Sequence, residues 1–311
     1  MNAIADVLET VEIVSEQQHD ALTVQYLTIK QTAELNIRSF REAIDGGALQ
    51  VTEVGEEGTV PELCFRNTGA FPVFVPEGCI IEGVKQSRFV AVSFIINPNV
   101  SLNVPVNCVE QLRWDSQGNF GHGSAYHMFS STRAMNSREV ARSLRAGHGY
   151  QGRKAQSETW ASIEKRLMSI VSRSSSRYVG DYYRDSSKKV STFLRGIIVP
   201  DDVSGLLALI DDKPVELTLM GSPRLFESHA QGLLNSIAGD CIDKGYRMSL
   251  RDKQVMTYRD FMDAVIKAKP EKYPSVGVGQ DLRFENKELV GSALVNENQN
   301  QLIHMGVYQN I

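Results

Sequence analysis

The sequence is poor in cysteine and has no long apolar run. Its four cysteines show no CxxC spacing, so neither a zinc knuckle nor a disulfide framework is indicated. The longest apolar runs, such as Phe89 to Ile96 and Val203 to Ile210, fall far short of the roughly 20 residues of a membrane helix. The start of the chain, from Met1 to Asp6, lacks the basic and apolar segments of a secretory signal. We therefore expect a cytoplasmic protein that has no membrane segment.

Several signatures of catalysis and cofactor binding are missing as well. The glycine-rich stretch from Gly147 to Gly152 has neither GxxxxGK[ST] nor a strand-borne GxGxxG, so the P-loop and Rossmann classes are set aside. The six histidines are scattered and none stands at HxH or HExxH spacing, so we assign no metal ligands. No pair of nucleophile and base is recognisable, and no internal repeat indicates a solenoid.

What is present is the composition of an ordinary soluble globular protein. The chain has 311 residues, of which 42% are hydrophobic and 23% charged, so it can bury a substantial core. The length permits one large domain or two ordinary ones. We expect a single α+β domain over residues 1–311, with a β-rich part (1–114), a basic helical segment (132–195) and a returning α/β part (196–311).

The charge is unevenly distributed along the chain. The stretch from Arg133 to Arg195 carries 14 basic and five acidic residues, a net charge of +9, so the remainder of this −4 chain carries −13. A positive middle in a negative protein indicates either an anionic ligand or partner, or docking against the acidic remainder of the same fold.

Strand-like and helix-like patterns together predict the α+β class. Short strands separated by turn signals dominate the first third and predict an antiparallel β-sandwich or barrel-like core. The predicted strands are Val11 to Val14, Ala21 to Ile29, Leu49 to Val54, Val60 to Arg66, Phe71 to Val75, Cys79 to Ile81, Gln86 to Ile96, Leu102 to Glu110, Leu206 to Ile210, Val215 to Leu219, Ser275 to Phe284, Leu289 to Val295 and Leu302 to Tyr308. The predicted helices run over about Ala33 to Ala43, Asn136 to the break at Gly147, Ser157 to Ser172, Asp185 to Leu194, Pro223 to Asp243 and Tyr258 to Ala268.

The basic segment is predicted to begin with a loop and a helix. Residues Asp115 to Ser131 are rich in Gly, Ser and aromatics, which favours a loop, and Ser137 can cap the helix that follows. Along that helix Arg138, Arg142 and Arg145 recur at helical spacing and share one face. This face is either solvated or a clamp for phosphate.

Two of the predicted strands are expected to form a hairpin that is apolar along most of its length and polar at one end. Gln86 to Ile96 and Leu102 to Glu110 each place an apolar face inward, and the turn signal between them predicts antiparallel pairing. Pairing Ile96 with Leu102 sets Arg88 opposite Glu110 and Val90 opposite Cys108. We expect a pocket at the polar end of this apolar sheet.

The polar end of the hairpin has two interpretations. An arginine paired with a glutamate at a sheet end is often only a structural ion pair. Here more polar groups gather than one ion pair needs, which favours a binding site. They are Glu82, Lys85, Gln86, Arg88, Glu110 and Arg113.

The cysteines are expected to be reduced thiols. Three of the four, Cys64, Cys79 and Cys108, lie in strand-like runs where burial is the usual outcome. Cys108 is the exception that we single out, because a neighbouring arginine would lower the pKa of its thiol and favour the thiolate.

Several motifs of this chain resemble one family. The segments Gly83 to Arg88 and Pro105 to Glu110, followed by Arg113 and Trp114, resemble the ARPP family, which is named for its association with ADP-ribosylglycohydrolases and rhodanese-phosphatases. Weaker likenesses are the Gln-x-x-x-Trp pattern that starts at Gln156, Gly205 to Asp243, Gly291 to Val295 and His304. The chain departs from the family at Ser87, where Asn is usual, and at Leu112, where Gly is usual.

The resemblance implies an architecture and a ligand class. The family's role in handling ADP-ribose or other NAD-derived nucleotides is assigned mainly from its neighbours, and no catalytic mechanism comes with it. The positions that match the family motifs are Lys85, Gln86, Arg88, Cys108, Glu110, Arg113 and Trp114.

Our first hypothesis is a protein that binds, and in one version hydrolyses, a phosphorylated nucleotide-like ligand. Arg88, Arg113 and Lys85 would bind phosphate oxygens, and Gln86 would orient the ligand. Cys108 and Trp114 complete the binding set. Glu110 would act as general base together with Glu82, which requires a raised carboxyl pKa, whereas a neighbouring arginine lowers it. No cofactor motif is present, and Mg²⁺ held by the two carboxylates and a phosphate stays open.

Two further hypotheses compete with the first. One is a protein without chemistry that sequesters a nucleotide or joins a complex in a defence or counter-defence system. The other makes the basic segment a nucleic-acid contact, which the acidity of the whole chain disfavours. We expect a small phosphorylated ligand and no membrane partner, and we leave a homo-oligomer open.

Overall fold

The computed structural model describes residues 3–30, 35–55, 60–83, 85–114, 121–152, 154–251, 256–296 and 301–310. Its helices are α1 (Ala3–Leu8), α2 (Phe40–Asp45), α3 (Ser130–Arg145), α4 (Ala155–Ser169), α5 (Val179–Phe193), α6 (Pro223–Ile242), α7 (Lys244–Arg251) and α8 (Tyr258–Lys267). Its strands are β1 (Glu12–His19), β2 (Leu22–Thr28), β3 (Arg38–Ser39), β4 (Leu49–Glu53), β5 (Glu62–Asn67), β6 (Val73–Val75), β7 (Cys79–Glu82), β8 (Arg88–Val90), β9 (Phe94–Ile96), β10 (Ser101–Cys108), β11 (Gly121–His127), β12 (Gly205–Ile210), β13 (Lys213–Met220), β14 (Glu271–Pro274), β15 (Gln280–Glu285), β16 (Leu289–Asn296) and β17 (Gln301–Gln309).

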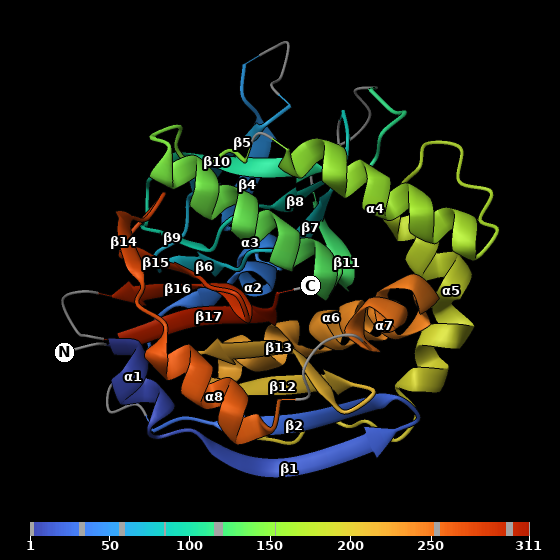
Figure 1. Cartoon of the computed structure of the whole chain (residues 1–311). Helices are drawn as coiled ribbons and strands as arrows, with labels where there is room; N and C mark the ends of the chain where they lie inside the picture. The colour runs from blue at the N-terminus through green and yellow to red at the C-terminus, as the bar shows by residue number, and fades with distance from the viewer. Residues whose placement is uncertain are drawn as a thin grey trace.

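The strands form three sheets, and the α+β class predicted from the sequence is confirmed (Figure 1). The largest sheet has eight strands in the order β1-β2-β12-β13-β17-β16-β15-β14, so the N-terminal hairpin joins the C-terminal strands. A six-stranded sheet has the order β11-β7-β8-β10-β5-β4, and a three-stranded sheet the order β3-β6-β9. One of the sheets curls into a half-barrel, in keeping with the predicted barrel-like core.

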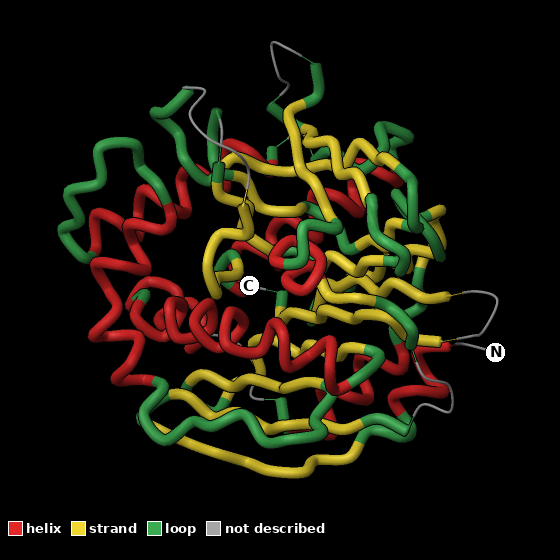
Figure 2. Tube along the Cα trace, turned by 180° about the vertical axis from the view of Figure 1, so that it is seen from behind, coloured by secondary structure: helices red, strands yellow, loops and turns green. Residues whose placement is uncertain are grey.

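The large sheet carries helices on both faces. Leu206 and Ala208 of β12 belong to the core that also contains residues of α6, whereas Leu207 belongs to the core that contains residues of α8. This alternation follows from the two-residue period of a strand. The remaining long helices, α4 and α5, lie along one side of the molecule, at the right of Figure 1 and the left of Figure 2. No helix of the described residues is long and apolar enough to cross a membrane.

Local sequence explains several of these elements. The hairpin of β12 and β13 turns at Asp211 and Asp212, which have φ of 50° and 62°, the left-handed conformation that suits a tight hairpin turn. Helix α6 begins as predicted, with Pro223 at its first position and the Ser222 side chain accepting a hydrogen bond from the Leu225 N–H. Helix α8, β16 and β17 also lie where the sequence predicted them, whereas β15 covers only the second half of the strand predicted from Ser275 to Phe284.

The predicted hairpin at the polar sheet end has a different register. The stretch from Gln86 to Ile96 is two short strands, β8 and β9, and β9 pairs with β6 in another sheet. Strand β10 pairs with β5 along its first half and with β8 along its second. Arg88 therefore lies opposite Cys108 rather than Glu110, and Val90 opposite Val106 rather than Cys108.

The predicted loop and helix of the basic segment also need correction. Strand β11 lies inside the predicted loop, of which residues 115–120 fall outside the described residues. Helix α3 begins at Ser130, so Ser137 is a buried interior residue and not a cap. Helix α2 begins at Phe40 rather than near Ala33, and α5 begins at Val179 rather than Asp185. Helices α1 and α7 and strands β3 and β14 were not predicted.

The basic segment docks against acidic residues of the same chain. Arg133 of α3 binds Glu216 of β13 through two hydrogen bonds, of 2.8 and 2.6 Å. Arg145 of the same helix contacts Glu271 and Glu285, which lie on β14 and β15. Of the two explanations for the uneven charge, docking within the fold is the one that these contacts bear out.

Candidate functional site

Arg88 is a fully buried arginine at the polar end of an apolar sheet. Its side chain is 0% exposed, and its backbone pairs with Cys108 on one side and Ile81 on the other. None of its three guanidinium nitrogens has a hydrogen-bond partner among the described residues. Buried guanidinium groups are normally paired, because an unpaired buried charge is costly. Arg88 therefore differs from the buried arginines that have a carboxylate partner, such as Arg133 and Arg166.

The neighbours of Arg88 include an aromatic ring and buried carboxylate oxygens. The Arg88 guanidinium carbon lies 5.7 Å from the centre of the Trp114 ring, and the Lys85 ammonium lies 5.5 Å from the same centre. Trp114 is 48% exposed, so it connects the buried arginine with the surface. The two carboxylate oxygens of Glu53 are also buried without a hydrogen-bond partner in the described part of the chain. Burial lowers the pKa of Arg88, and the nearby Cys108, Glu53 and Glu110 partly oppose this shift.

Glu110 is buried, and one of its carboxylate oxygens already accepts hydrogen bonds from neighbouring residues. Its Oε2 accepts hydrogen bonds from the Ser87 N–H (3.2 Å), the Ser87 hydroxyl (3.1 Å) and the Arg113 guanidinium (2.7 Å). Burial raises the pKa of Glu110, but hydrogen bonds from Arg113, Ser176 and Ser87 outweigh burial, so the pKa lies below its usual value. The carboxylate thus stays ionised. The arginine that holds it is Arg113 and not, as the sequence indicated, Arg88.

Arg113 and Glu82 are each tied to a neighbour. Arg113 donates to the Gly83 carbonyl oxygen at 3.3 Å as well as to Glu110, and its side chain is 29% exposed. Glu82, at the end of β7, accepts a hydrogen bond from the Tyr178 hydroxyl. Gln86 is buried and Lys85 is half-buried. The structure thus gathers Lys85, Arg88, Glu110, Arg113 and Trp114 in one region, as expected, but with different pairings.

Cys108 does not have the expected activated thiol. Burial raises the pKa of Cys108 to about 11, and the neighbouring Arg88 opposes this shift without overcoming it. The expectation of a thiolate is therefore wrong. The backbone of Cys108 is clamped by Gln156 of α4, whose side-chain oxygen accepts from the Cys108 N–H at 2.7 Å and whose amide donates to the carbonyl at 3.1 Å. This contact gives the Gln-x-x-x-Trp pattern a structural role.

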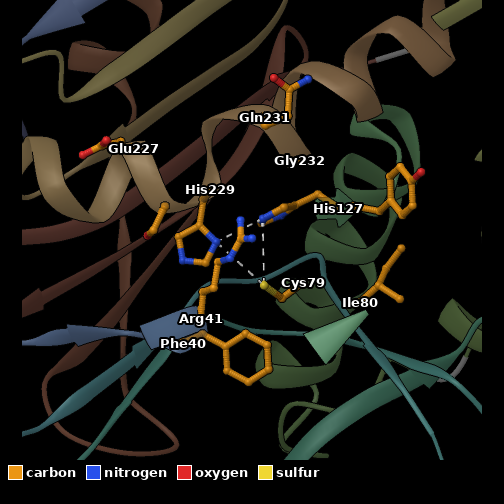
Figure 3. Close-up of a pocket in the computed structure, with 11 residues that line it drawn as sticks. Phe40, Arg41, Cys79, Ile80, His127, Glu227, His229, Gln231 and Gly232 are labelled. Carbon is orange, nitrogen blue, oxygen red and sulfur yellow. Dashed lines mark hydrogen bonds between the residues drawn. The ribbon is translucent and has the colours of Figure 1, made fainter. Parts of the chain in front are cut away.

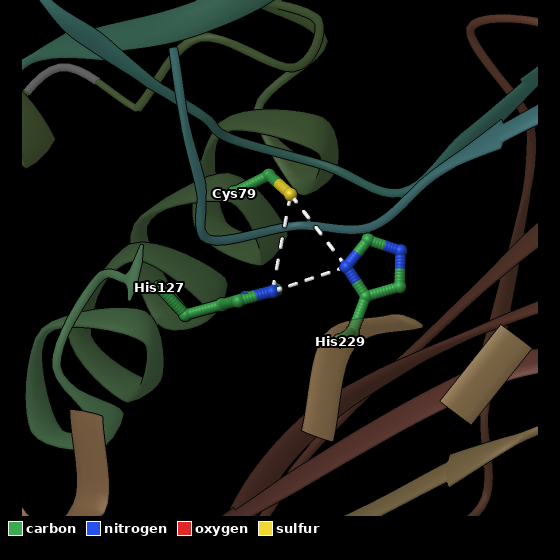
Figure 4. Close-up of side chains that lie close together, drawn as sticks. All are labelled: Cys79, His127 and His229. Carbon is green, nitrogen blue, oxygen red and sulfur yellow. Dashed lines mark hydrogen bonds between the residues drawn. The ribbon is translucent and has the colours of Figure 1, made fainter. Parts of the chain in front are cut away.

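A second cluster of polar side chains includes Cys79, which lies on the strand next to Arg88, and this cluster was missed from the sequence. Cys79, His127 and His229 meet beside a pocket of about 60 Å³ that is also lined by Arg41 and Glu227 (Figure 3). The ligand atoms of all three residues lie within 4.8 Å of one another (Figure 4). The sequence assigned no metal ligands, because these residues are 48, 102 and 150 positions apart and share no local spacing.

The two histidines of this cluster are buried in the neutral form. Burial, followed by the charge of Arg41, lowers the pKa of His229 to about 4. Burial also lowers the pKa of His127, followed by the charges of His229 and Arg133. Burial raises the pKa of Cys79 far above that of an ordinary thiol. His304, the histidine of the last strand, lies nearby and shares a hydrogen bond of 3.0 Å with the Ser93 hydroxyl.

Comparison with known proteins identifies the family. The model of the ARG and Rhodanese-Phosphatase-superfamily-associated Protein domain (ARPP-1) matches residues 10–308, and the chain belongs to this family. The search of curated proteins found no match, and neither did the search of solved structures.

Proposed function

We propose that this protein binds a phosphorylated nucleotide-like ligand of the ADP-ribose or NAD-derived class at the site around Arg88. The observation that carries the proposal is the Arg88 guanidinium, which is fully buried and has no hydrogen-bond partner among the described residues. A phosphate offers the oxygen acceptors that such a planar fork of donors binds best.

The side chains near Arg88 suit both the phosphate and the nucleobase of such a ligand. Lys85 adds a second cation at the Trp114 ring, and its ammonium would supply further phosphate donors. Trp114 is half-exposed and offers an aromatic face on which a nucleobase can stack. Gln86 is buried close by in sequence and would orient the ligand, as the family resemblance implies. Family membership supports the ligand class.

The state of Glu110 favours binding over hydrolysis. A general base needs a carboxylate that can take a proton near neutral pH. Glu110 has a lowered pKa and one oxygen that already accepts three hydrogen bonds, so it is better suited to fixing Arg113 and Ser87. We therefore favour the version in which the ligand is sequestered, alone or within a defence or counter-defence complex. The alternative is hydrolysis of the ligand by Glu110 and Glu82 with Mg²⁺, and recovery of an altered ligand would favour it.

A small ligand is also a better match than a nucleic acid. Arg142 and Arg145 of α3, which a nucleic-acid contact would use, are paired with Glu285, and Arg145 also with Glu271. All four cysteines are free thiols, which agrees with a reducing cytoplasm as the place where this ligand is met. We therefore include in the proposal that the ligand is a small molecule and that the protein binds it in the cytoplasm.

The test combines binding with recovery of the ligand. ADP-ribose, NAD and cyclic nucleotides are each titrated into the protein by calorimetry, with and without Mg²⁺. Each mixture is then chromatographed before and after denaturation. We expect one of these ligands to bind and to return unchanged after unfolding. Arg88→Met should weaken that binding by about 100-fold or more, since charged hydrogen bonds to phosphate contribute about 1.5–3 kcal/mol each.

The matched control removes the same charge elsewhere. Arg184 is an exposed arginine paired with Asp181 on α5, and Arg184→Met should bind as the wild type does. Equal affinity of the wild type and Arg88→Met, or no binding of any phosphorylated ligand, contradicts the proposal. A hydrolysed product that disappears in Glu110→Gln shifts the conclusion to the catalytic version.

A further inference from the structure

The cluster of Cys79, His127 and His229 has the geometry of a metal site. The two facing imidazole nitrogens, Nε2 of His127 and Nδ1 of His229, lie 3.4 Å apart. The Cys79 sulfur lies 3.8 Å from the first nitrogen and 4.0 Å from the second. All three side chains point toward one another (Figure 4).

These separations match three corners of a tetrahedron around zinc. With Zn–N bonds of about 2.0–2.1 Å and a Zn–S bond of about 2.3 Å, a tetrahedral centre separates two nitrogens by about 3.4 Å and a nitrogen from a sulfur by about 3.6 Å. The nitrogen pair is at this separation, and the sulfur needs to move by only about 0.2–0.4 Å. A side-chain rotation of about 10°, which stays within one rotamer well, achieves such a shift.

Three different elements hold the ligands in place. Cys79 is the first residue of β7, and His127 is the last residue of β11, which pairs with it directly. The Met128 N–H donates to the Gly78 carbonyl oxygen at 2.8 Å, which fixes the two strands just beside the ligands. His229 comes from α6, a helix of 20 residues with a largely buried face. The cluster is 3–6% exposed, so packing leaves its side chains little freedom.

We propose that Cys79, His127 and His229 bind a transition-metal ion of the zinc class, with the fourth coordination position open to the adjoining pocket. Two imidazoles and one thiolate form a donor set that suits zinc and disfavours Mg²⁺, which prefers oxygen ligands. Three protein ligands with one free position are typical of catalytic rather than structural zinc sites. The Mg²⁺ considered from the sequence would therefore not belong here.

The pocket beside the cluster supports an exchangeable fourth ligand. Arg41 and Glu227 line it together with all three metal ligands, and Arg41 acts electrostatically on His229 (Figure 3). Arg41 is exposed and pairs with Asp45, and it brings a positive charge to this pocket while Glu227 brings a negative one. The pocket therefore offers polar surroundings for water or another exchangeable ligand at the free position. The nearby charge of Arg133 is balanced, because this buried arginine is paired with Glu216.

The site is tested by metal content and by cobalt spectroscopy, neither of which needs an activity. The purified protein is stripped with a chelator, reloaded with Zn²⁺ or Co²⁺, desalted and measured by elemental analysis. We expect one equivalent of metal per chain. The Co²⁺ form should show the strong visible bands of tetrahedral coordination and a near-ultraviolet thiolate band. Cys79→Ser should lose the thiolate band, and His127→Gln or His229→Gln should bind about 100-fold or more weakly.

Two control variants separate the loss of a ligand from a general disturbance of the core. His304→Gln changes another buried histidine of the same region, and Cys241→Ala removes another buried thiol. Both should retain one equivalent of metal and the cobalt spectrum. Because a ligand variant can fail to fold, the unfolding temperature of the wild type is also measured, and Zn²⁺ should raise it.

Several outcomes would overturn the inference. They are a wild type that retains no metal after desalting, a cobalt spectrum without tetrahedral bands, and equal metal content in the wild type and a folded Cys79→Ser variant. The inference does not depend on the ligand proposed above. Arg88→Met should keep its metal, so failure of one proposal leaves the other standing.

Discussion

At the scale of single residues, the buried arginines of this protein fall into two kinds. Arg133 and Arg166 have carboxylate partners, Glu216 and Asp240, at hydrogen-bonding distance. Arg88 is equally buried and has no such partner among the described residues. A buried ion pair roughly balances its own desolvation, whereas a buried charge without a partner destabilises the fold. This contrast is why we assign Arg88 to ligand binding and the other two to structure.

Glu110, unlike Arg88, is a buried charge with several hydrogen-bond partners, and its contribution to stability can be measured. Its pKa is lowered in the folded protein, so its stabilisation is present above the unfolded pKa of about 4.3 and is lost as the pH falls through the folded value. Glu110→Gln should lower the free energy of unfolding at pH 7 by about 1–3 kcal/mol. In urea titrations this difference should shrink as the pH falls below about 4.

A surface carboxylate provides the control for this experiment. Glu12 is exposed and paired with Lys30, so Glu12→Gln should change the free energy of unfolding by less than about 1 kcal/mol. If Glu110→Gln is as stable as the wild type at pH 7, or if its deficit is the same at all pH values, Glu110 does not hold this site together.

The residues of the site were predicted from the sequence better than their pairings. The polar end of an apolar strand pair was visible in the alternation of residues around Arg88 and Cys108, and the structure places both there. The pairing was wrong by two residues, because no turn signal in the sequence marks the break of the strand after Val90. The break has tertiary causes, since the Ser93 hydroxyl accepts from the Glu77 N–H at 2.9 Å and also contacts His304.

At the scale of elements, α3 shows how tertiary contacts override local signals. The sequence predicted its start near Asn136 and Ser137, where Ser137 is a good capping residue. The helix begins seven residues earlier, at Ser130, because Asp240 of α6 accepts hydrogen bonds from the N–H (3.0 Å) and the hydroxyl (2.7 Å) of Ser131. A carboxylate from another helix thus caps the first turn. Likewise β11, rich in Gly and Ser, is a strand because it pairs with β7.

The arginine face of α3 is expected to contribute to stability through Glu285. This carboxylate meets Arg142 at 3.7 Å and Arg145 at 2.7 Å, and its side chain is 16% exposed. Glu285→Gln should lower the free energy of unfolding by about 1 kcal/mol at low salt, with a smaller effect in 1 M NaCl, where charges are screened. Urea titrations at both salt concentrations provide the measurement.

The exposed Glu288 lies outside this face and serves as the charge-matched control. Glu288→Gln should have little effect at either salt concentration. A Glu285→Gln variant that loses no stability at low salt would show that Glu285 does not hold the arginine face of α3 against the acidic strands.

At the scale of the whole molecule, the fold joins segments that are far apart in the chain. The eight-stranded sheet unites β1 and β2 with strands that follow residue 204, and the metal-site cluster unites β7, β11 and α6. Hydrophobic periodicity predicted most of the strands that build these layers. It could not predict the cluster, because three residues without a shared motif meet only once the sheets and α6 have packed.

The two sites also lie close together on the assembled sheet. Arg88 is opposite Ile81 on β7, two residues along that strand from Cys79, a backbone separation of about 7 Å. Cys79 and Ile81 belong to one apolar core together with Val90, Val104 and Val106. The same apolar sheet therefore supports both the proposed ligand site and the proposed metal site.

The free energy of unfolding of Arg88→Met, measured with and without ligand, decides whether Arg88 is a ligand-binding residue. If Arg88 is a buried charge that waits for an anion, the unliganded variant should be more stable than the wild type by about 1–3 kcal/mol. A saturating phosphorylated ligand at about 100 times its dissociation constant should stabilise the wild type by about 2.7 kcal/mol and leave the variant unchanged. Arg133→Met, which strands Glu216 in the core, should instead lose about 3–5 kcal/mol. An Arg88→Met variant that is destabilised to the same extent as Arg133→Met would contradict the account.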